Sequence, residues 1–288
     1  MKKHFLYLLF PVVLFSGCKD DPEQIPAYLE LQPFAVNAQG GASWQKITDG
    51  WLYVNGEFLG AYTLPATVPI LAEGESEVIL FPGVKENGIS ATPNIYPFLK
   101  RYEVQHVLTP AQTTTVSPVT EYEANVEFPW ESRGEFDSGS TLQFENRDGD
   151  NNTGFSLSTD GAFSGKSVLM EVDTAHWLIE IASEKASQLP VTGEKQVWLE
   201  MNYKNDMPFT LYLLGTKGTS NELAQVVYQF NNSENWNKIY LNLTEFLTAT
   251  AQEDYRLFFR TSLPRNESNK FTQNNGRVML DNIRLVHF

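Results

Sequence analysis

Short runs in which apolar and polar residues alternate fill most of the chain, and turn residues separate them. In WLYVNGEFLGAYT two β-prone stretches flank Asn55-Gly56, the strongest short hairpin signal. EVILFPGV, YEVQHVLT and TTTVSPVTEYE have the character of further strands. About seven short strands in roughly ninety residues predict a small β-sandwich over residues 28–123.

The second half, residues 126–288, repeats the pattern on a larger scale. Its strand-like runs are SVLMEVD, QVWLEMNY, FTLYLLG, LAQVVYQF, WNKIYLNL, YRLFFRT and RVMLDNIRLV. Turn-rich breaks separate these runs, and only LTEFLTATA favours a short helix. Many evenly spaced strands with scarcely a helix predict a jelly-roll β-sandwich, so the whole chain is expected to be all-β.

The start of the chain follows a different pattern. Lys2 and Lys3 precede an apolar run, Phe5 to Phe15, that is too short for a permanent transmembrane helix. Residues 1–17 therefore predict an export signal, which is excluded from the fold. Residues 18–27 contain Pro22 and Pro26 and are expected to form an extended tether.

Phe15-Ser16-Gly17-Cys18 resembles the lipobox of bacterial lipoproteins, and Cys18 is the sole cysteine of the chain. The resemblance implies lipidation of Cys18, with acyl chains holding the protein on a membrane. Lys19-Asp20-Asp21 resembles the surface-export signal of Bacteroidetes lipoproteins, which implies the outer membrane and its exterior face. The alternatives are an ordinary cleaved signal with an incidental cysteine, and a plain polar tether.

Two further resemblances cover the two halves. Most of residues 28–123 looks like an amino-terminal region of Bacteroidetes lipoproteins, and VNGEFLG is similar to PEGA-type surface domains. FSGKSVLMEV, NWNKIYLNLTEF and VMLDNIRL resemble the jelly rolls of carbohydrate-binding modules and galactose-binding-like domains. That resemblance implies a fold and says little about a ligand.

Composition narrows the range of partners. The formal net charge is −14, which argues against nucleic acid as a partner. Apolar residues make up 42% of the chain and aromatic residues 13%, enough for folded cores.

The alternation along the second-half strands predicts a ligand-binding face. If the faces opposite the core line one sheet, they combine aromatic rings, on which sugars stack, with amides, guanidinium groups and a carboxylate, which bind hydroxyls. The candidate residues are Trp198, Glu200, Asn202, Tyr212, Gln225, Gln229, Tyr240, Asn242, Arg256 and Arg260. The alternative is that these are ordinary outer-face residues, some under an additional layer; Trp198 is the first position to test.

Asp281 is a weak metal candidate. In the jelly rolls that the chain resembles, an acid in the last strand often helps to hold a structural Ca²⁺, and Glu145, Asp160 or backbone near Gly165 would supply further oxygens. The alternative is an aspartate that closes a turn through backbone amides. DGDNN, residues 148–152, lacks the glycine and glutamate of an EF-hand loop and is interpreted as a solvated turn. Asp173-Thr174-Ala175 matches the Bacteroidetes O-glycosylation pattern, with Thr174 as acceptor.

Catalytic signals are weak. The motifs of serine hydrolases, zinc proteases, P-loops and dinucleotide folds do not occur. His106, His176 and His287 are isolated, and Glu131, Glu135 and Asp137 are interpreted as linker. The sequence therefore predicts a lipid-anchored surface protein that binds carbohydrate or another surface ligand without catalysis. The alternatives are a structural subunit of an outer-membrane protein complex and a jelly-roll glycoside hydrolase.

Overall fold

The computed structural model of the chain describes residues 23–38, 41–137, 139–218 and 221–288. The predicted signal, Cys18 and the Lys19-Asp20-Asp21 cluster lie outside the described residues. Within these ranges, no helix combines the length and the apolar character that a membrane span needs.

The first half forms a small lobe of short strands, residues 27–120. One sheet has the order β5-β1-β9, a second has the order β4-β3-β6-β7 with β8 paired to β6, and β10 pairs with β2. The elements are β1 (Ala27–Leu31), β2 (Ala35–Val36), η1 (Gly41–Trp44), β3 (Asp49–Val54), β4 (Glu57–Thr63), β5 (Ala66–Ile70), β6 (Gly74–Lys85), β7 (Pro93–Ile95), β8 (Tyr102–Leu108), β9 (Thr113–Val116) and β10 (Val119–Thr120).

The hairpin predicted at Asn55-Gly56 is confirmed. It joins β3 to β4, and both turn residues have positive φ, 51° and 80°, which two-residue hairpins of this hand require. Alternate residues of the paired strands, among them Leu52, Val78 and Leu80, pack into one apolar core between the sheets.

The second half forms a large lobe of two stacked sheets. We name the sheet β11-β14-β20-β17-β18, with β15 paired to β20, the open sheet, and the sheet β12-β13-β21-β16-β19 the docked sheet. The strands are β11 (Phe144–Asn146), β12 (Ser156–Ser158), β13 (Ser167–Asp173), β14 (Leu178–Ser183), β15 (Ala186–Ser187), β16 (Val197–Asn205), β17 (Phe209–Thr216), β18 (Leu223–Phe230), β19 (Ser233–Asn242), β20 (Asp254–Ser262) and β21 (Asn275–His287). The short helix predicted in LTEFLTATA is present as α1 (Thr244–Thr250).

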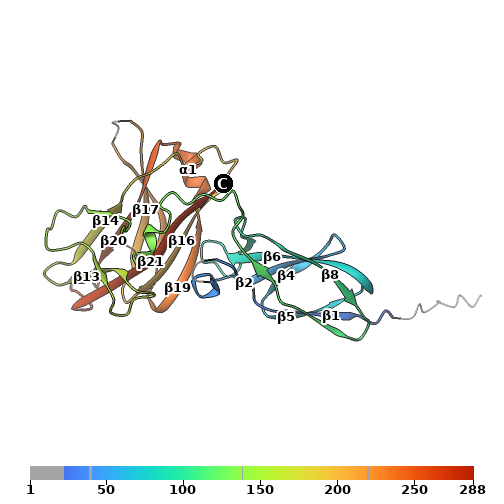
Figure 1. Cartoon of the computed structure of the whole chain (residues 1–288). Coiled ribbons are helices and arrows are strands. Elements are labelled where there is room, and N and C mark those ends of the chain that lie inside the picture. The colour runs from blue at the N-terminus through green and yellow to red at the C-terminus, as the bar shows by residue number, and fades with distance from the viewer. Residues whose placement is uncertain (1–22, 39–40, 138, 219–220) are drawn as a thin grey trace, which may run out of the picture.

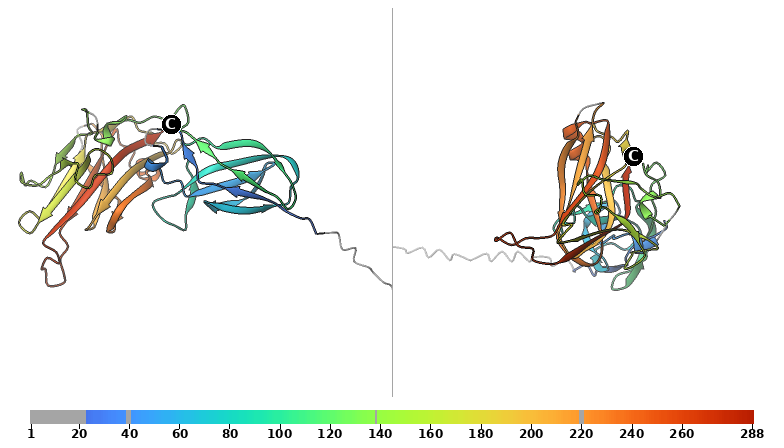
Figure 2. Two further views of the ribbon diagram at one scale, coloured as in Figure 1. Left: turned by 60° about the horizontal axis from the view of Figure 1, so that its bottom comes forward. Right: turned by 90° about the vertical axis from the view of Figure 1, so that its left-hand side faces the viewer.

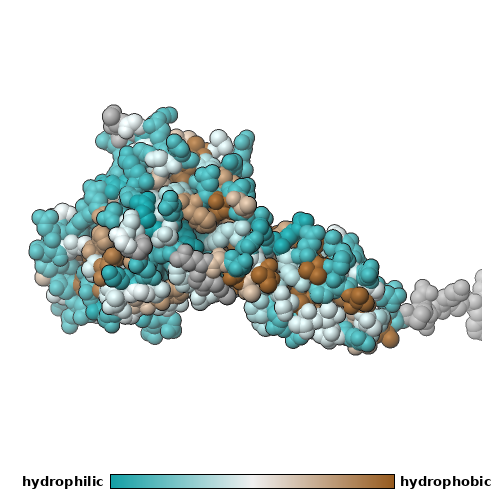
Figure 3. Space-filling view, in the orientation of Figure 1, coloured by the Kyte–Doolittle hydropathy of each residue, from teal (hydrophilic) through white to brown (hydrophobic). Residues whose placement is uncertain are grey.

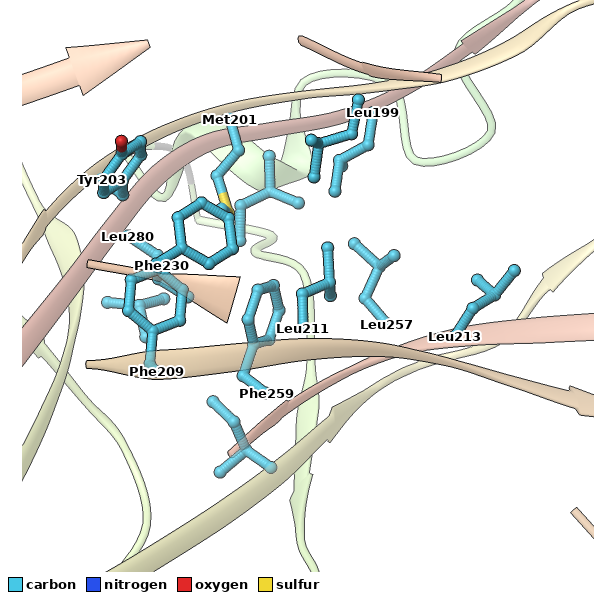
Figure 4. Packing of buried hydrophobic residues seen from close by; sticks show 14 of the residues in the cluster. Leu199, Met201, Tyr203, Phe209, Leu211, Leu213, Phe230, Leu257, Phe259 and Leu280 are labelled. Atoms are coloured by element: carbon cyan, nitrogen blue, oxygen red, sulfur yellow. The ribbon is translucent and has the colours of Figure 1, made fainter. Parts of the chain in front are cut away.

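The core of the large lobe lies between these two sheets. Leu199, Met201 and Leu280 of the docked sheet point toward Leu211 and Phe259 of the open sheet, as Figure 4 shows. Each of these side chains is buried and alternates along its strand with a residue of the outer face. The prediction of an all-β chain, with a small sandwich followed by a jelly-roll sandwich, is confirmed.

The segment between the lobes is packed rather than loose. It contains η2 (Arg133–Glu135), and a Cβ added to Gly134 would lie 1.9 Å from the carbonyl oxygen of Ile283. Glu135 is buried and pairs with Arg284, while Asp137 accepts a hydrogen bond of 2.7 Å from the backbone N–H of Lys166. The interpretation of Glu135 and Asp137 as linker is therefore wrong, because both carboxylates hold this segment against the large lobe.

The two lobes lie end to end (Figure 1). The chain enters at the end of the small lobe that is farther from the large lobe, and a second view shows the same extended arrangement (Figure 2). On the face drawn in Figure 3, hydrophilic residues dominate the large lobe, and hydrophobic patches lie on the small lobe and near the junction.

Candidate functional site

The structure divides the ten candidate ligand residues between two surfaces. Five lie on the docked sheet, on the face that meets the small lobe: Trp198, Glu200, Asn202, Tyr240 and Asn242. The other five lie on the open sheet: Tyr212, Gln225, Gln229, Arg256 and Arg260. The prediction of one continuous binding face is thus corrected, because the outward faces of the two sheets point in opposite directions.

The outer face of the docked sheet is the junction between the lobes. Tyr96, which follows β7, inserts its ring against Trp198 and Tyr240, with ring centroids 5.4 and 5.0 Å apart. All three side chains are buried, with 0%, 0% and 2% of their surface exposed. Trp198 is therefore not available to a ligand, because an aromatic side chain of the small lobe occupies the position that a sugar ring was expected to take.

A buried charge lies at the centre of the junction. The carboxylate of Glu200 accepts hydrogen bonds from the hydroxyls of Tyr96 and Tyr122, at 2.5 and 2.7 Å, and pairs with the Lys238 ammonium at 2.9 Å. Burial disfavours the charged carboxylate, but the charges of Lys238 and Arg284 outweigh this effect and lower the pKa of Glu200. Burial and the same carboxylate raise the pKa of Tyr96 and Tyr122 well above the usual value, so both hydroxyls stay donors.

Backbone pairing also joins the lobes. Beyond the end of β6, Glu86 forms a parallel bridge with Tyr240, and the N–H of Asn87 donates to the Tyr240 carbonyl at 2.9 Å. The Asn242 amide donates to the Glu86 carboxylate at 2.8 Å. Asn202 is buried on the same sheet and accepts a hydrogen bond from Asn282. The polar candidates of the docked sheet therefore serve the junction and its surroundings.

The open sheet presents its outer face to solvent, and its residues fall into two rows. Val226, Tyr212 and Phe258 are aligned across β18, β17 and β20 and form an apolar row, in which the two aromatic rings lie 5.4 Å apart. Gln229 and Thr210 are aligned with Arg260 in a polar row, which lies two residues along β17 and β20 from the apolar row and three residues along the bulged β18.

The polar row continues onto β14 and borders a groove. Glu180 is aligned with Arg260, and the two side chains form an ion pair at 3.2 Å. A groove of about 350 Å³ is lined by Thr210, Tyr212, Gln229 and Arg260, together with residues at the ends of the strands. The open sheet thus offers an apolar strip beside a strip of donors and acceptors.

A network of ion pairs lies on the outer face of the open sheet, on the side of the apolar row away from the polar row. Arg256 contacts the carboxylates of Glu145 at 2.7 Å and Glu222 at 3.6 Å, and Arg147 contacts Glu222 at 2.7 Å. The Arg147 hydrogen bond is the main reason why the pKa of Glu222 is lowered, although burial opposes it. Arg256 and Glu145 are therefore engaged with each other, which removes Glu145 from the metal candidates.

Sequence reasoning placed one residue of the open sheet wrongly and missed two. A bulge between Leu211 and Tyr212 shifts the pairing of β18, so Gln225 is aligned with the buried Leu213 and Val226 takes the outward position. The period-two pattern that selected Arg256 and Arg260 also places Phe258 between them on the same face. Phe258 was therefore detectable, whereas the bulge that exchanges Gln225 and Val226 leaves no signal in the alternation.

The loop of residues 263–274, beside the groove, packs on a further aromatic residue, Trp177, which directly precedes β14. Pro264 lines the groove, and the guanidinium of the adjacent Arg265 lies over the rings of Trp177 and Phe271, 4.9 and 4.1 Å from their centroids. Trp177 is 41% exposed. This loop, residues 263–274, projects from the large lobe in Figure 2.

The metal candidates do not meet. Asp281 is buried and accepts hydrogen bonds from Ser167 at 2.6 Å and from the backbone N–H of Asn282. Burial raises its pKa to about 7. Asp160 is exposed and lies 3.5 Å from Arg277. Over the described ranges, no three side chains of the histidine, cysteine, aspartate or glutamate type come together as a metal site.

The remaining singled-out residues have local roles. In residues 148–152 Asp148 and Asp150 accept turn hydrogen bonds, and Asp150 pairs with His176 at 2.6 Å. Thr174 is exposed on the turn after β13. His106 lies 3.3 Å from the Tyr102 hydroxyl, and the backbone of His287 bonds to Glu127. These three histidines occupy three separate places.

Comparison with known proteins gives a likeness in overall layout. No protein-family model matches the chain, and no curated protein matches it. Solved structures that are similar include a family 11 carbohydrate-binding module of the cellulosomal cellulase Lic26A-Cel5E of Clostridium thermocellum, with a TM-score of 0.36 and 12% identity over 56% of this chain and 95% of that chain. Another is the family 61 module TmCBM61 in complex with β-1,4-galactotriose, with a TM-score of 0.35 and 10% identity over 55% of this chain and 97% of that chain.

A larger protein is similar in the same way. The enzymatically active domain of tailspike protein 4 of bacteriophage CBA120 has a TM-score of 0.40 and 11% identity, covering 60% of this chain and 25% of that chain. The matched region is thus about a quarter of the tailspike chain. A likeness at these scores says nothing about a ligand or an activity of this chain.

Proposed function

We propose that this protein binds a glycan, without catalysis, on the outer face of the open sheet. The single observation that supports this most is the apolar row of Val226, Tyr212 and Phe258 beside the polar row of Gln229, Thr210, Arg260 and Glu180. Sugars have one face rich in C–H groups and a rim of hydroxyls. The first packs on apolar and aromatic side chains, and the second exchanges hydrogen bonds with amides, guanidinium groups and carboxylates.

The spacing of the rows suits such a ligand. Residues two apart along a strand lie about 6.6–6.8 Å apart, so one pyranose on the apolar row keeps its hydroxyls within reach of the polar row. The strands hold both rows in a fixed arrangement, which lowers the entropy lost on binding. The groove of about 350 Å³ is open enough to accept a ring within a longer chain.

The charged groups of this face support binding more than catalysis. Glu180 pairs with Arg260, Glu145 with Arg256, and Glu222 with Arg147. Each of these carboxylates is engaged by an arginine, whereas a glycosidase needs one protonated acid facing a second carboxylate. That the protein is not an enzyme stays a prediction.

A glycan array tests the proposal with three proteins. Wild type should bind at least one class of glycan, and Tyr212→Ala should weaken this binding by about tenfold or more, since the loss of about 1.4 kcal/mol of packing on the ring is a factor of ten in affinity. Phe58→Ala is the matched control, because Phe58 is an exposed aromatic side chain of the small lobe, 47% exposed. If wild type binds no glycan, or if Tyr212→Ala binds as tightly as wild type, the open sheet is not the site.

The setting of this binding activity is also part of the proposal. The Cys18 lipobox supports a lipid anchor in the outer membrane, with the Lys19-Asp20-Asp21 cluster favouring the exterior face. Metabolic labelling with a palmitate analogue should mark wild type and not Cys18→Ala. Added protease should degrade the protein on intact cells. If wild type is not labelled, the proposed lipid anchor is contradicted. If the protein is completely protected from the protease, the proposed exterior location is contradicted.

One observation favours the alternative of a structural subunit in an outer-membrane complex. The second sheet of the small lobe carries a continuous group of rings on its outer face: Trp51 stacks on Phe58 at 5.4 Å, and Tyr53 contacts Phe58 and Phe81 at 5.0 and 5.6 Å. Exposed aromatic groups of this kind are common at protein interfaces. This role would be supported if crosslinking in intact membranes repeatedly captures one partner protein with wild type and does not capture it with Phe58→Ser.

A further inference from the structure

Lysines gather where the two lobes meet, in a chain that is otherwise strongly acidic. A cavity of about 100 Å³ lies in the junction, and its lining includes Lys46 and Lys85 of the small lobe and Lys238 of the large lobe. Hydroxyl groups of Thr48, Ser90 and Tyr228 line it as well. We name this cavity the lysine pocket.

The positive charge of the pocket exceeds the negative charge in contact with it. Lys85 pairs with Asp49 at 2.8 Å, and Lys238 pairs with Glu200 at 2.9 Å. Lys46 instead donates to the side-chain oxygen of Asn237 at 2.6 Å. Among the described residues, no carboxylate lies within ion-pair distance of Lys46, which leaves one ammonium charge unbalanced here.

The two carboxylates near the pocket are already well supplied with donors. Asp49 accepts from Thr48 and Thr63 at 2.6 and 3.1 Å in addition to Lys85. Glu200 is held by two tyrosine hydroxyls and Lys238. Three ammonium groups offer about nine N–H donors, and the contacts above use one from each lysine. The pocket therefore has donors to spare and a surplus of positive charge.

The three ammonium groups differ in exposure: Lys46 is an exposed residue, whereas the side chains of Lys85 and Lys238 are 24% and 4% exposed. Partial desolvation by neighbouring atoms lowers the pKa of Lys46. A buried charge is stable when a charge of opposite sign accompanies it. An anion with several acceptor oxygens would satisfy both the charge and the free N–H groups.

We propose that the lysine pocket binds a small oxyanion, either free sulfate or phosphate or the acidic group of a sugar. The anion contacts Lys46 and Lys85 from one lobe and Lys238 from the other, so it ties the lobes together. This site is separate from the open sheet and does not depend on glycan binding there.

Thermal unfolding of the full mature chain tests the site. Sodium sulfate and sodium phosphate are compared with sodium chloride at equal ionic strength, and glucuronate is added as a model acidic sugar. Sulfate or phosphate at about one hundred times its Kd should raise the Tm by roughly 5–10 °C, and the rise should saturate. Sulfate also stabilises proteins by exclusion from their surface, but that effect does not saturate.

Variants separate the two effects. Lys46→Met should weaken the saturable effect by about tenfold or more, since a charge-assisted hydrogen bond is lost. Lys270→Met, at an exposed lysine of the β20–β21 loop, is the matched control and should behave as wild type. Ser90→Ala is a milder change in the pocket, and it covers the case in which Lys46→Met fails to fold.

The outcomes are distinct. A saturable response to glucuronate that matches sulfate identifies an acidic sugar as the source, and a response to sulfate or phosphate alone identifies a free ion. The proposal is overturned if no anion gives a saturable rise over chloride, or if Lys46→Met and Ser90→Ala both respond as wild type does. Calorimetric titration of wild type with sulfate gives the same answer without heating.

Discussion

The two sheets of the large lobe carry similar outer faces but have different surroundings. The docked sheet places Trp198, Glu200 and Tyr240 outward, and the small lobe buries all three. The open sheet places Tyr212, Phe258 and Arg260 outward, and these remain accessible. The comparison teaches that alternation places aromatic and charged residues on the outer side of a strand, and that the fold of the rest of the chain decides whether another part of the same chain covers them.

The largest expected difference between the faces is in stability. Trp198→Ala should lower the free energy of unfolding by about 3–5 kcal/mol, because it leaves a cavity between packed rings. Tyr212→Ala should cost only about 1 kcal/mol, because its ring is part-exposed. Urea unfolding of both variants measures the contrast, and equal losses would show that the two faces are equally buried.

Charge at the junction gives the second contrast. Glu200→Gln should cost about 3 kcal/mol, since it leaves Lys238 charged and buried without its partner. Adding Lys238→Met should restore a large part of the loss, because the double variant has no uncompensated charge. A double-mutant cycle by urea unfolding checks this. A double variant less stable than Glu200→Gln would mean that the pair is not coupled.

The buried Asp281 of β21 and the exposed Asp160 should differ in how they make stability depend on pH. The folded pKa of Asp281, about 7, lies above the unfolded value. Between about pH 4 and 7 the unfolded chain has released this proton and the folded chain keeps it, so the free energy of unfolding falls as pH rises. Asp281→Asn should remove roughly 4 kcal/mol of that fall, since about three pKa units at about 1.36 kcal/mol each separate the two states.

Unfolding curves at several pH values measure this slope. Asp160→Asn is the control, since the Asp160 side chain is 84% exposed, and it should leave the slope as in wild type. An unchanged slope in Asp281→Asn would mean that Asp281 titrates normally.

The smallest effect is expected on the open sheet. Arg260→Gln breaks an ion pair with Glu180 whose arginine is half-exposed, at 49%. Such pairs contribute little, so stability should change by at most about 0.5 kcal/mol, while glycan binding should fall. A loss of several kcal/mol would show that the polar row supports the fold rather than a ligand.

Local signals predicted much of the fold. Asn55-Gly56 marked a hairpin because few other pairs tolerate positive φ at both positions. LTEFLTATA predicted the helix, and alternation in VWLEMNY separated Leu199 and Met201, which face the core between the sheets, from Trp198 and Glu200 on the outer face. These features depend on neighbours in sequence, which the pattern records.

Whether each outer face is covered or exposed depends on residues far away in the sequence. Tyr96 and Glu200 are 104 positions apart, and nothing in either local sequence indicates that they meet. A bulge in β17–β18 pairing likewise exchanged Gln225 for Val226 on the open sheet. Alternation tells which side of a strand a residue occupies and cannot tell what lies beyond that side.

The bridge between Glu86 and Tyr240 has a mechanical consequence. Because backbone hydrogen bonds and the Tyr96 ring connect the lobes, tension between the open sheet and the beginning of the described chain passes through strand-to-strand contacts as well as the covalent connection. The molecule should therefore extend under pulling as one stiff rod of two lobes, and single-molecule stretching should show the lobes separating only at forces that tear the junction apart.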